Sequence, residues 1–135
     1  MNPDNPPLRL CVFARNYTII EKTNQTRKME DGATLIFGTT GADQLEILSL
    51  GNKLVFGGAG TDIIDAVFSE GGSRLYGGSG GDELVASEGD RLFGGAGNDT
   101  LDASAGNGNN RLYGVEGDDE LIAGRNDRLF GGGRK

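Results

Sequence analysis

The residues best suited to chemistry in this chain are aspartates that follow short glycine clusters. Each stands at the sixth position of a recurring nine-residue pattern, as in GGAGTDIID (57–65) and GGAGNDTLD (94–102). Glycines let the backbone turn carbonyl oxygens to one side, and the aspartate adds negative charge. Oxygen ligands of this kind suit a hard cation and favour Ca²⁺ over zinc or a soft metal. The aspartates are Asp43, Asp62, Asp82, Asp99 and Asp119.

These glycine clusters recur along the chain at a nested spacing. They begin at Gly38, Gly57, Gly77, Gly94, Gly114 and Gly131, and successive starts are 19, 20, 17, 20 and 17 residues apart. Residues 57–93 laid over 94–130 without a gap give 21 identities in 37 positions. Self-similarity at a fixed period of this length predicts stacked coils that bury their apolar faces only against their neighbours.

Each coil is predicted to contain two short strands. One follows the aspartate and carries aliphatic or alanine residues two positions apart, which is the period of a strand with one buried side. The other precedes each glycine cluster and reads LIF, LVF, RLY or RLF. Equivalent strands would stack in parallel about 4.8 Å apart, so five coils would make a rod about 24 Å long. Only small and medium aliphatic residues point inward, which predicts a thin core.

Stacking would place the five aspartates in one column. Two carboxylates about 4.8 Å apart repel by roughly 0.9 kcal/mol at the dielectric constant of water and about 3.5 kcal/mol at an effective value near 20. A divalent ion between successive turns would remove this penalty. The alternative is that the segments are only tight turns, in which aspartate accepts local backbone hydrogen bonds. That alternative suits a single segment better than five in phase.

Composition excludes several classes of function. The net charge of −7 disfavours nucleic acids and anionic membranes as partners. The chain has no histidine and one cysteine, Cys11, which excludes zinc sites of the usual kind, an internal disulfide and histidine-based catalysis. We therefore expect no enzymatic activity. No cleavable signal peptide and no stretch of transmembrane length is visible in the sequence.

Two outward ladders are predicted on the strands that precede the glycine clusters. The aromatic ladder would stiffen a thin sheet by stacking, or would bind a sugar or another partner. The Arg ladder would be a solvated face, or would bind an acidic polysaccharide. The aromatic ladder is Phe37, Phe56, Tyr76, Phe93, Tyr113 and Phe130, and the Arg ladder is Arg74, Arg91, Arg111 and Arg128.

Residues 1–33 fall outside the repeat. Their segments LRLCVFA and NYTII have the composition of strands and are predicted to cap the first coil, whose edges would otherwise be open. The sequence thus divides into an N-terminal flank, 1–33, and a repeat domain, 34–135.

The nine-residue pattern resembles that of a known family. GGAGTDIID, GGSGGDELV and GGAGNDTLD match every position of GGxGxDxUx, where U is a large aliphatic residue, whereas GTTGADQLE and GVEGDDELI lack the second glycine. In this the chain is similar to the repeats-in-toxin (RTX) family of haemolysin-type calcium-binding repeats. The resemblance implies an all-β fold, a right-handed parallel β-roll (a β-solenoid) of about five coils, with calcium between consecutive turns. It also implies an extracellular, secreted protein.

The resemblance implies a ligand set for about four calcium ions in one column. One turn would give the carbonyls of its second and fourth residues and its aspartate, and the next turn those of its first and third residues and its aspartate. One site would use Gly58, Gly60 and Asp62 with Gly77, Ser79 and Asp82, and the next Gly78, Gly80 and Asp82 with Gly94, Ala96 and Asp99. A third would use Gly95, Gly97 and Asp99 with Gly114, Glu116 and Asp119, and a fourth Thr39, Gly41 and Asp43 with Gly57, Ala59 and Asp62. Val115, Gly117 and Asp119 would form half of a fifth, weak or empty site.

The opposite turns depart from the family pattern. They read LSLGNK, VFSEGGS, SEGD, SAGNGNN and GRND, and these segments share no ligand set. We therefore expect no second calcium column and interpret Asp90 and Asp127 as turn-forming residues. The sequence predicts a calcium-binding structural module that folds on binding Ca²⁺ and is part of a larger secreted protein. The alternative is an adhesion or acidic-polysaccharide-binding module, with a polysaccharide or a cell surface as partner.

Overall fold

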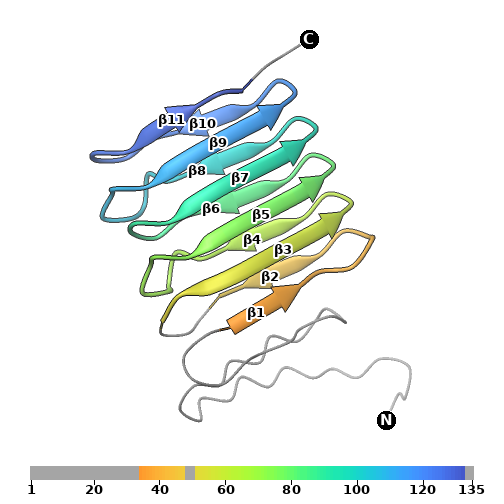
Figure 1. The fold of residues 1–135 in the computed structure, drawn as a ribbon, viewed down its shortest axis with the longest axis horizontal. Helices are drawn as coiled ribbons and strands as arrows, with labels where there is room; N and C mark the ends of the chain where they lie inside the picture. Colours follow the sequence, from red (N-terminus) through yellow and green to blue (C-terminus); the bar gives the residue numbers. More distant parts are fainter. Residues whose placement is uncertain (1–33, 48–50, 133–135) are drawn as a thin grey trace.

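The computed structural model describes residues 34–47 and 51–132, which form eleven short strands wound into successive coils (Figure 1). Within these residues there is no helix, and so none that is long and apolar enough to cross a membrane. The all-β solenoid of about five coils predicted from the repeat is confirmed. The cap predicted for residues 1–33 lies outside the described residues.

Every second strand belongs to one six-stranded sheet, which we call the first sheet. All its pairings are parallel, and each strand pairs with the equivalent strand of the next coil, as in Leu75 with Leu92. Its strands are β1 (Thr34–Phe37), β3 (Lys53–Ala59), β5 (Arg74–Ser79), β7 (Arg91–Ala96), β9 (Arg111–Glu116) and β11 (Arg128–Phe130).

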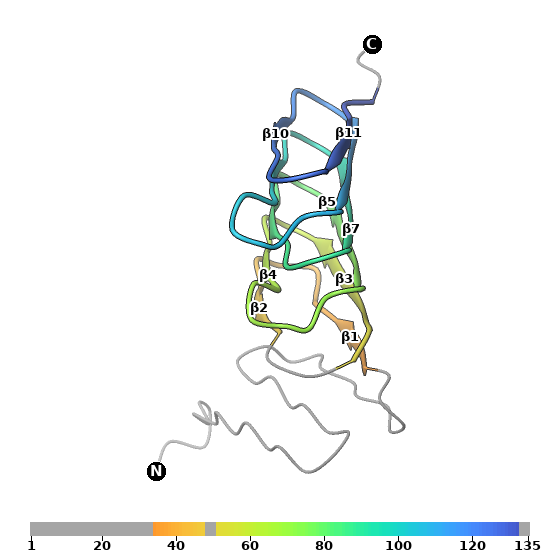
Figure 2. The same cartoon turned by 90° about the vertical axis from the view of Figure 1, so that its left-hand side faces the viewer.

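The remaining strands form a five-stranded sheet, the second sheet, which is also parallel throughout. Figure 2 looks at the solenoid from the side and shows the two sheets facing each other across a narrow interior. The strands of the second sheet are β2 (Gln44–Glu46), β4 (Ile63–Asp65), β6 (Glu83–Val85), β8 (Thr100–Asp102) and β10 (Glu120–Ile122).

The core is a single layer of aliphatic side chains between the sheets. Alternation along each strand buries one residue in two, because successive side chains point to opposite faces. Leu75 and Leu92 of the first sheet and Leu84 and Leu101 of the second are fully buried, with alanines such as Ala86 beside them. In the last described coil, the equivalent Leu129 is 41% exposed. The coil-on-coil burial predicted from the period is confirmed.

The aromatic ladder runs along the outer face of the first sheet. Its rings stack in sequence with centroids 4.7 to 5.5 Å apart and planes within 13° of parallel. Each interior ring therefore has a neighbour on both faces and presents only its edge to solvent. This geometry favours the interpretation that the ladder stiffens the sheet, because a sugar ring packs against an exposed aromatic face.

The two sheets are joined by two sets of turns on opposite sides of the solenoid. One set contains the glycine-aspartate segments. The opposite set alternates between long turns, such as 66–73 and 103–110, and shorter ones, which follows the alternation of 20- and 17-residue intervals in the sequence. The two sets differ in how they hold successive coils together.

Candidate metal sites

The five predicted aspartates form one column, which we call the aspartate column. Its members are tied by hydrogen bonds from coil to coil. The backbone N–H of Asp62 donates to Oδ1 of Asp82, and that of Asp82 donates to Oδ1 of Asp99, each at 2.8 Å. Asp43 and Asp99 donate in the same way to Asp62 and Asp119. One oxygen of each accepting carboxylate is thus occupied by the preceding coil.

The second oxygen of these carboxylates has no partner. Oδ2 of Asp62, Asp82, Asp99 and Asp119 is buried and accepts no hydrogen bond. A buried charged oxygen without a donor costs several times more than an ordinary unpaired polar group, because it has lost its hydration. A cation beside each Oδ2 would remove this cost, so the chemistry of the column fits a metal.

The first glycine of each turn leaves the space that such an ion requires. A Cβ atom on Gly57 would lie 2.6 Å from Oδ2 of Asp62 and 2.7 Å from the carbonyl oxygen of Gly77 in the next coil. At Gly77 the equivalent distances are 2.5 Å to Asp82 Oδ2 and 2.7 Å to the Gly94 carbonyl. An aspartate oxygen and a carbonyl oxygen of the following turn therefore converge on one cradle.

Other predicted carbonyls face the gap between coils. A Cβ on Gly78 or Gly80 would meet the carbonyl oxygen of Gly58 or Gly60 in the preceding coil, which shows that these carbonyls point along the solenoid axis. Gly78 and Gly80 have φ values of 111° and 120°, a region that side chains disfavour. The third-position carbonyls of Ser79, Ala96 and Glu116 accept N–H groups of Gly60, Gly80 and Gly97, and each retains one lone pair.

The two turns that lack the second glycine differ from the others. In the first, the N–H and the hydroxyl of Thr39 both donate to Asp43, and neither Thr39 nor Gly41 has a positive φ. The carboxylate of Asp43 thus has protein donors that the later aspartates lack. In the last, Val115 is held at φ 85°, which is strained for a β-branched residue. These two departures from the motif therefore alter the turns at both ends of the aspartate column.

Burial raises the pKa of the column aspartates. The pKa of Asp62 and that of Asp99 rise to about 6, chiefly because burial penalises the charged carboxylate. The N–H groups of Asp43 and Asp82 oppose the increase, and the charges of neighbouring aspartates add to it. The pKa of Asp82 is raised for the same main reason. Without a cation, the folded column resists full ionisation.

The opposite turns contain a second column that the sequence analysis missed. We call it the hydrogen-bond column. The N–H of Ser73 donates to Asp90 Oδ1 at 2.7 Å, and the N–H of Asp90 donates to Asn110 Oδ1 at 2.7 Å. The backbone N–H of Lys53 donates to Ser73 Oγ, and that of Asn110 donates to Asp127 Oδ1. Its members are Lys53, Ser73, Asp90, Asn110 and Asp127.

The oxygens of this second column are already satisfied by the protein. Oδ2 of Asp90 accepts the N–H of Ser87 at 2.7 Å, and Oδ2 of Asp127 accepts that of Gly124 at 2.6 Å. Both aspartates therefore behave as turn-forming residues, and neither offers an unpaired oxygen to a cation. A common position was detectable in the sequence, because Ser73, Asp90, Asn110 and Asp127 each come directly before an Arg-Leu pair.

Two further observations concern the chemistry of the site. Within the described ranges, no group of three or more His, Cys, Asp or Glu side chains gathers as a metal centre, whereas each glycine cradle brings one aspartate oxygen beside a backbone carbonyl. Residues 77–81 match the GxSxG spacing of a serine nucleophile, but the chain has no histidine to activate Ser79.

Comparison with known proteins identifies a family whose repeats cover most of the glycine-aspartate turns. The RTX calcium-binding nonapeptide repeat matches in four copies, over residues 50–66, 69–92, 76–108 and 104–133, which together cover more than half of the chain. No curated protein and no solved structure matches the chain. The matched repeats carry the unpaired aspartate oxygens and the glycine cradles described above. The chain therefore belongs to the RTX calcium-binding nonapeptide repeat family.

Proposed function

We propose that residues 34–135 form a structural module that folds on binding calcium, preceded by a flank at 1–33. Membership of the family makes the chain a calcium-binding repeat protein. The observation that supports dependence of folding on calcium is the set of four buried, unpartnered aspartate oxygens. Without a cation these oxygens oppose the stacked state, and the ligands come together only when coils are stacked.

We further propose that about four ions lie in the aspartate column. Three of them would use the carbonyl and carboxylate oxygens that the resemblance to the RTX family implies for turns 57–62, 77–82, 94–99 and 114–119. The site between the first two turns would be weaker, because Asp43 already accepts hydrogen bonds from Thr39. Affinities in the range of extracellular calcium modules, about 10⁻⁴ to 10⁻³ M, suit a module of a secreted protein.

The proposal is tested by counting bound calcium. Equilibrium dialysis of the full chain at pH 7 should give three to four calcium ions per chain at saturation. Mg²⁺ should not bind with comparable affinity. Substitution of Asp90 should leave this count unchanged. About twice that number of ions would indicate a second column on the opposite side, and no binding at millimolar calcium would refute the proposal.

Calcium affinity is expected to fall at acidic pH. In the calcium-free fold, the pKa values of Asp62 and Asp99 lie near 6, so at pH 5 calcium must displace protons from both. Each displaced proton lowers the apparent affinity by up to about tenfold per pH unit below the pKa. Titrations in a stabilising osmolyte that keeps the calcium-free chain folded, at pH 8, 7 and 5, should therefore show little change over the first interval and a decrease of more than about tenfold over the second. A constant affinity would contradict the proposed role of these carboxylates.

A methyl group in the cradle is expected to block calcium. Gly77→Ala places Cβ between Asp82 Oδ2 and the Gly94 carbonyl, while φ at Gly77 is not in the left-handed region, so the cost comes from these contacts and not from backbone strain. We expect the calcium midpoint of folding to rise about tenfold, with a packing cost of about 1 to 3 kcal/mol. Gly41→Ala is the matched control, because its Cβ would have no neighbour closer than 3.9 Å. Equal effects would show that the cradle is not the ion site.

A second candidate function is binding of an acidic polysaccharide along the Arg ladder. The supporting observation is a separation of charge between the outer faces. Strand pairing aligns the four arginines on the first sheet, whereas Asp65, Glu83 and Asp102 lie on the second. Among the described residues, no guanidinium of the ladder has an ion-pair partner. Polygalacturonate should bind in a salt-dependent manner that Arg91→Ala with Arg111→Ala abolishes, and unchanged binding would reject this function.

A further inference from the structure

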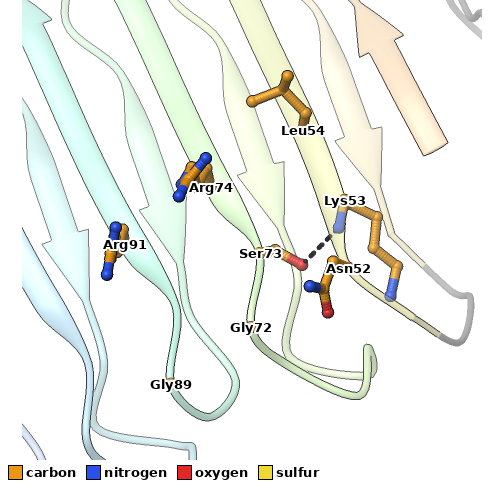
Figure 3. A pocket seen from close by; sticks show the side chains of 8 residues that line it. All are labelled: Asn52, Lys53, Leu54, Gly72, Ser73, Arg74, Gly89 and Arg91. Carbon is orange, nitrogen blue, oxygen red and sulfur yellow. Dashed lines mark hydrogen bonds between the residues drawn. The ribbon is translucent and has the colours of Figure 1, made fainter. Parts of the chain in front are cut away.

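A cavity lies at one end of the Arg ladder, the row of side chains for which binding of an acidic polysaccharide is the second candidate function. It has a volume of about 340 Å³ and is formed where β3, β5 and β7 begin. Figure 3 shows Arg74 and Arg91 side by side on neighbouring strands, with Asn52 and Leu54 on the adjoining strand β3 and the turn before it. The volume lies at the small end of the range for ligand pockets, which suits one compact unit.

The pocket carries the uncompensated positive charge of two arginines, Arg74 and Arg91. Its lining includes Lys53, Arg74 and Arg91 and no carboxylate. The ammonium of Lys53 donates to the Gly51 carbonyl, and its buried charge is opposed by Asp90 and Glu70. Arg74 and Arg91 pair in register, so their backbones lie about 4.8 Å apart. An anion between the two guanidinium groups would relieve their repulsion, and the planar forks match a carboxylate.

The pocket also marks the end of the cationic row. Leu54 pairs in register with Arg74, so the position that holds arginine in the next four coils holds leucine here. Leu54 is half-buried and presents aliphatic surface, and the side chain of Asn52 lies over Gly72 with its amide atoms 3.1 to 4.0 Å from a Cβ built there. A ligand unit for this pocket therefore combines a carboxylate, polar hydroxyl groups and a C–H surface.

Two other classes of linear polyanion fit this face less well. Single-stranded nucleic acid binds by stacking bases on aromatic faces, and the interior rings of the ladder have both faces covered. An extended acidic peptide adds to a sheet edge through its backbone, but the pocket lies on a sheet face whose strands β3, β5 and β7 are all paired on both sides. A rigid polymer with carboxylates attached to sugar rings meets neither obstacle.

We propose that this pocket binds one carboxylate-bearing sugar residue and so fixes where an acidic polysaccharide begins along the Arg ladder. The proposal rests on the second candidate function described above. It predicts that short acidic oligosaccharides bind at the Arg74–Arg91 end in preference to the Arg111–Arg128 end. It also predicts that binding requires calcium, because the two arginines come into register only when the coils are stacked.

The test uses the full chain in saturating calcium with trigalacturonate as the probe and a neutral glucose trimer as its control. Arg74→Ala with Arg91→Ala should lower trigalacturonate affinity at least about tenfold, as expected when a bidentate charged pair is lost. The matched control, Arg111→Ala with Arg128→Ala, removes the same charge from the same ladder outside the pocket and should change affinity less than about twofold. Circular dichroism in calcium confirms that both variants are folded.

The possible outcomes distinguish failure of the proposed pocket from failure of the polysaccharide function on which it rests. Equal losses in the two double variants, or binding of long polygalacturonate without binding of the trimer, would overturn the pocket and leave the polysaccharide function standing. Binding of neither probe by the native chain would overturn both. Equal binding of the neutral trimer, or tighter binding of polyglutamate or of a single-stranded polynucleotide, would overturn the assignment to an acidic sugar.

Discussion

Replacement of Asp99 by asparagine is expected to affect the calcium-free and the calcium-bound protein in opposite directions. Asparagine retains an acceptor for the N–H of Asp82 but removes the charge of a buried carboxylate whose pKa burial raises to about 6. Without calcium at pH 7, loss of this charge should stabilise the stacked coils by about 1 kcal/mol or more. With calcium, Asp99 is the carboxylate shared by two proposed sites, so calcium affinity should fall at least about tenfold.

The sign of the calcium-free effect depends on pH in a defined way. The folded pKa of about 6 lies above the ordinary value of 3.8, so ionisation of Asp99 opposes folding. The penalty is absent below about pH 4 and grows as the pH rises through 6. The advantage of Asp99→Asn in chelator should therefore disappear at pH 4. The measurement is the concentration of a stabilising osmolyte that folds the chelated chain, set beside the calcium midpoint of folding.

Asp102→Asn is the matched control for this experiment. Asp102 lies three residues further along on the outer face of β8, where it is half-buried and its Oδ1 accepts the N–H of Ser104. It should change neither the osmolyte midpoint nor the calcium midpoint appreciably. If Asp99→Asn instead weakened the calcium-free and calcium-bound states equally, Asp99 would be a turn-forming residue and not a ligand.

Replacement of Asp90 by alanine is expected to destabilise the fold in calcium by about 3 to 5 kcal/mol. The carboxylate is fully buried, and its two oxygens accept the N–H groups of Ser73 and Ser87. Alanine would leave both donors unpaired in the interior, at about 1 to 3 kcal/mol each, and would remove the charge that opposes buried Lys53. Urea unfolding in saturating calcium measures the loss.

The equivalent change at Asp127 provides the control for Asp90→Ala. Asp127 accepts the same kinds of bond, from Asn110 and Gly124, but Gly124 and its turn are exposed, so water can replace the lost acceptor. Asp127→Ala should cost about 1 kcal/mol. Both variants should bind the native number of calcium ions at saturation. A lower count for Asp90→Ala would show that the opposite turns do hold metal.

Much of this architecture could be predicted because the repeat determines which residues of successive coils lie next to each other. Once residues 57–93 are known to repeat as 94–130, stacking places Asp62 near Asp82 and Phe56 near Tyr76, and period two decides which side chains point inward. The inward Leu75 and Leu92 and the outward Arg74 and Arg91 follow from the same rule. No side-chain detail is required for these predictions.

The hydrogen-bond column was not predictable from residue identity. Its positions require only a short side chain whose acceptor oxygen reaches the backbone N–H of the preceding coil. Serine, aspartate and asparagine all meet that need. Ser73, Asp90 and Asn110 therefore differ in residue type, and only their common place before an Arg-Leu pair relates them in the sequence. The altered first turn likewise depends on the hydroxyl of Thr39 reaching Asp43, a local contact that the motif does not encode.

The central claim is that calcium in the aspartate column holds the coils together, and it is tested most directly by circular dichroism of the full chain during a calcium titration. In excess chelator at pH 7 the β-sheet signal should be largely lost, because charged, unpartnered carboxylates oppose stacking. Calcium should restore the signal cooperatively with a midpoint of about 10⁻⁴ to 10⁻³ M, whereas Mg²⁺ should not. A β-sheet signal that is unchanged by chelation would contradict the account.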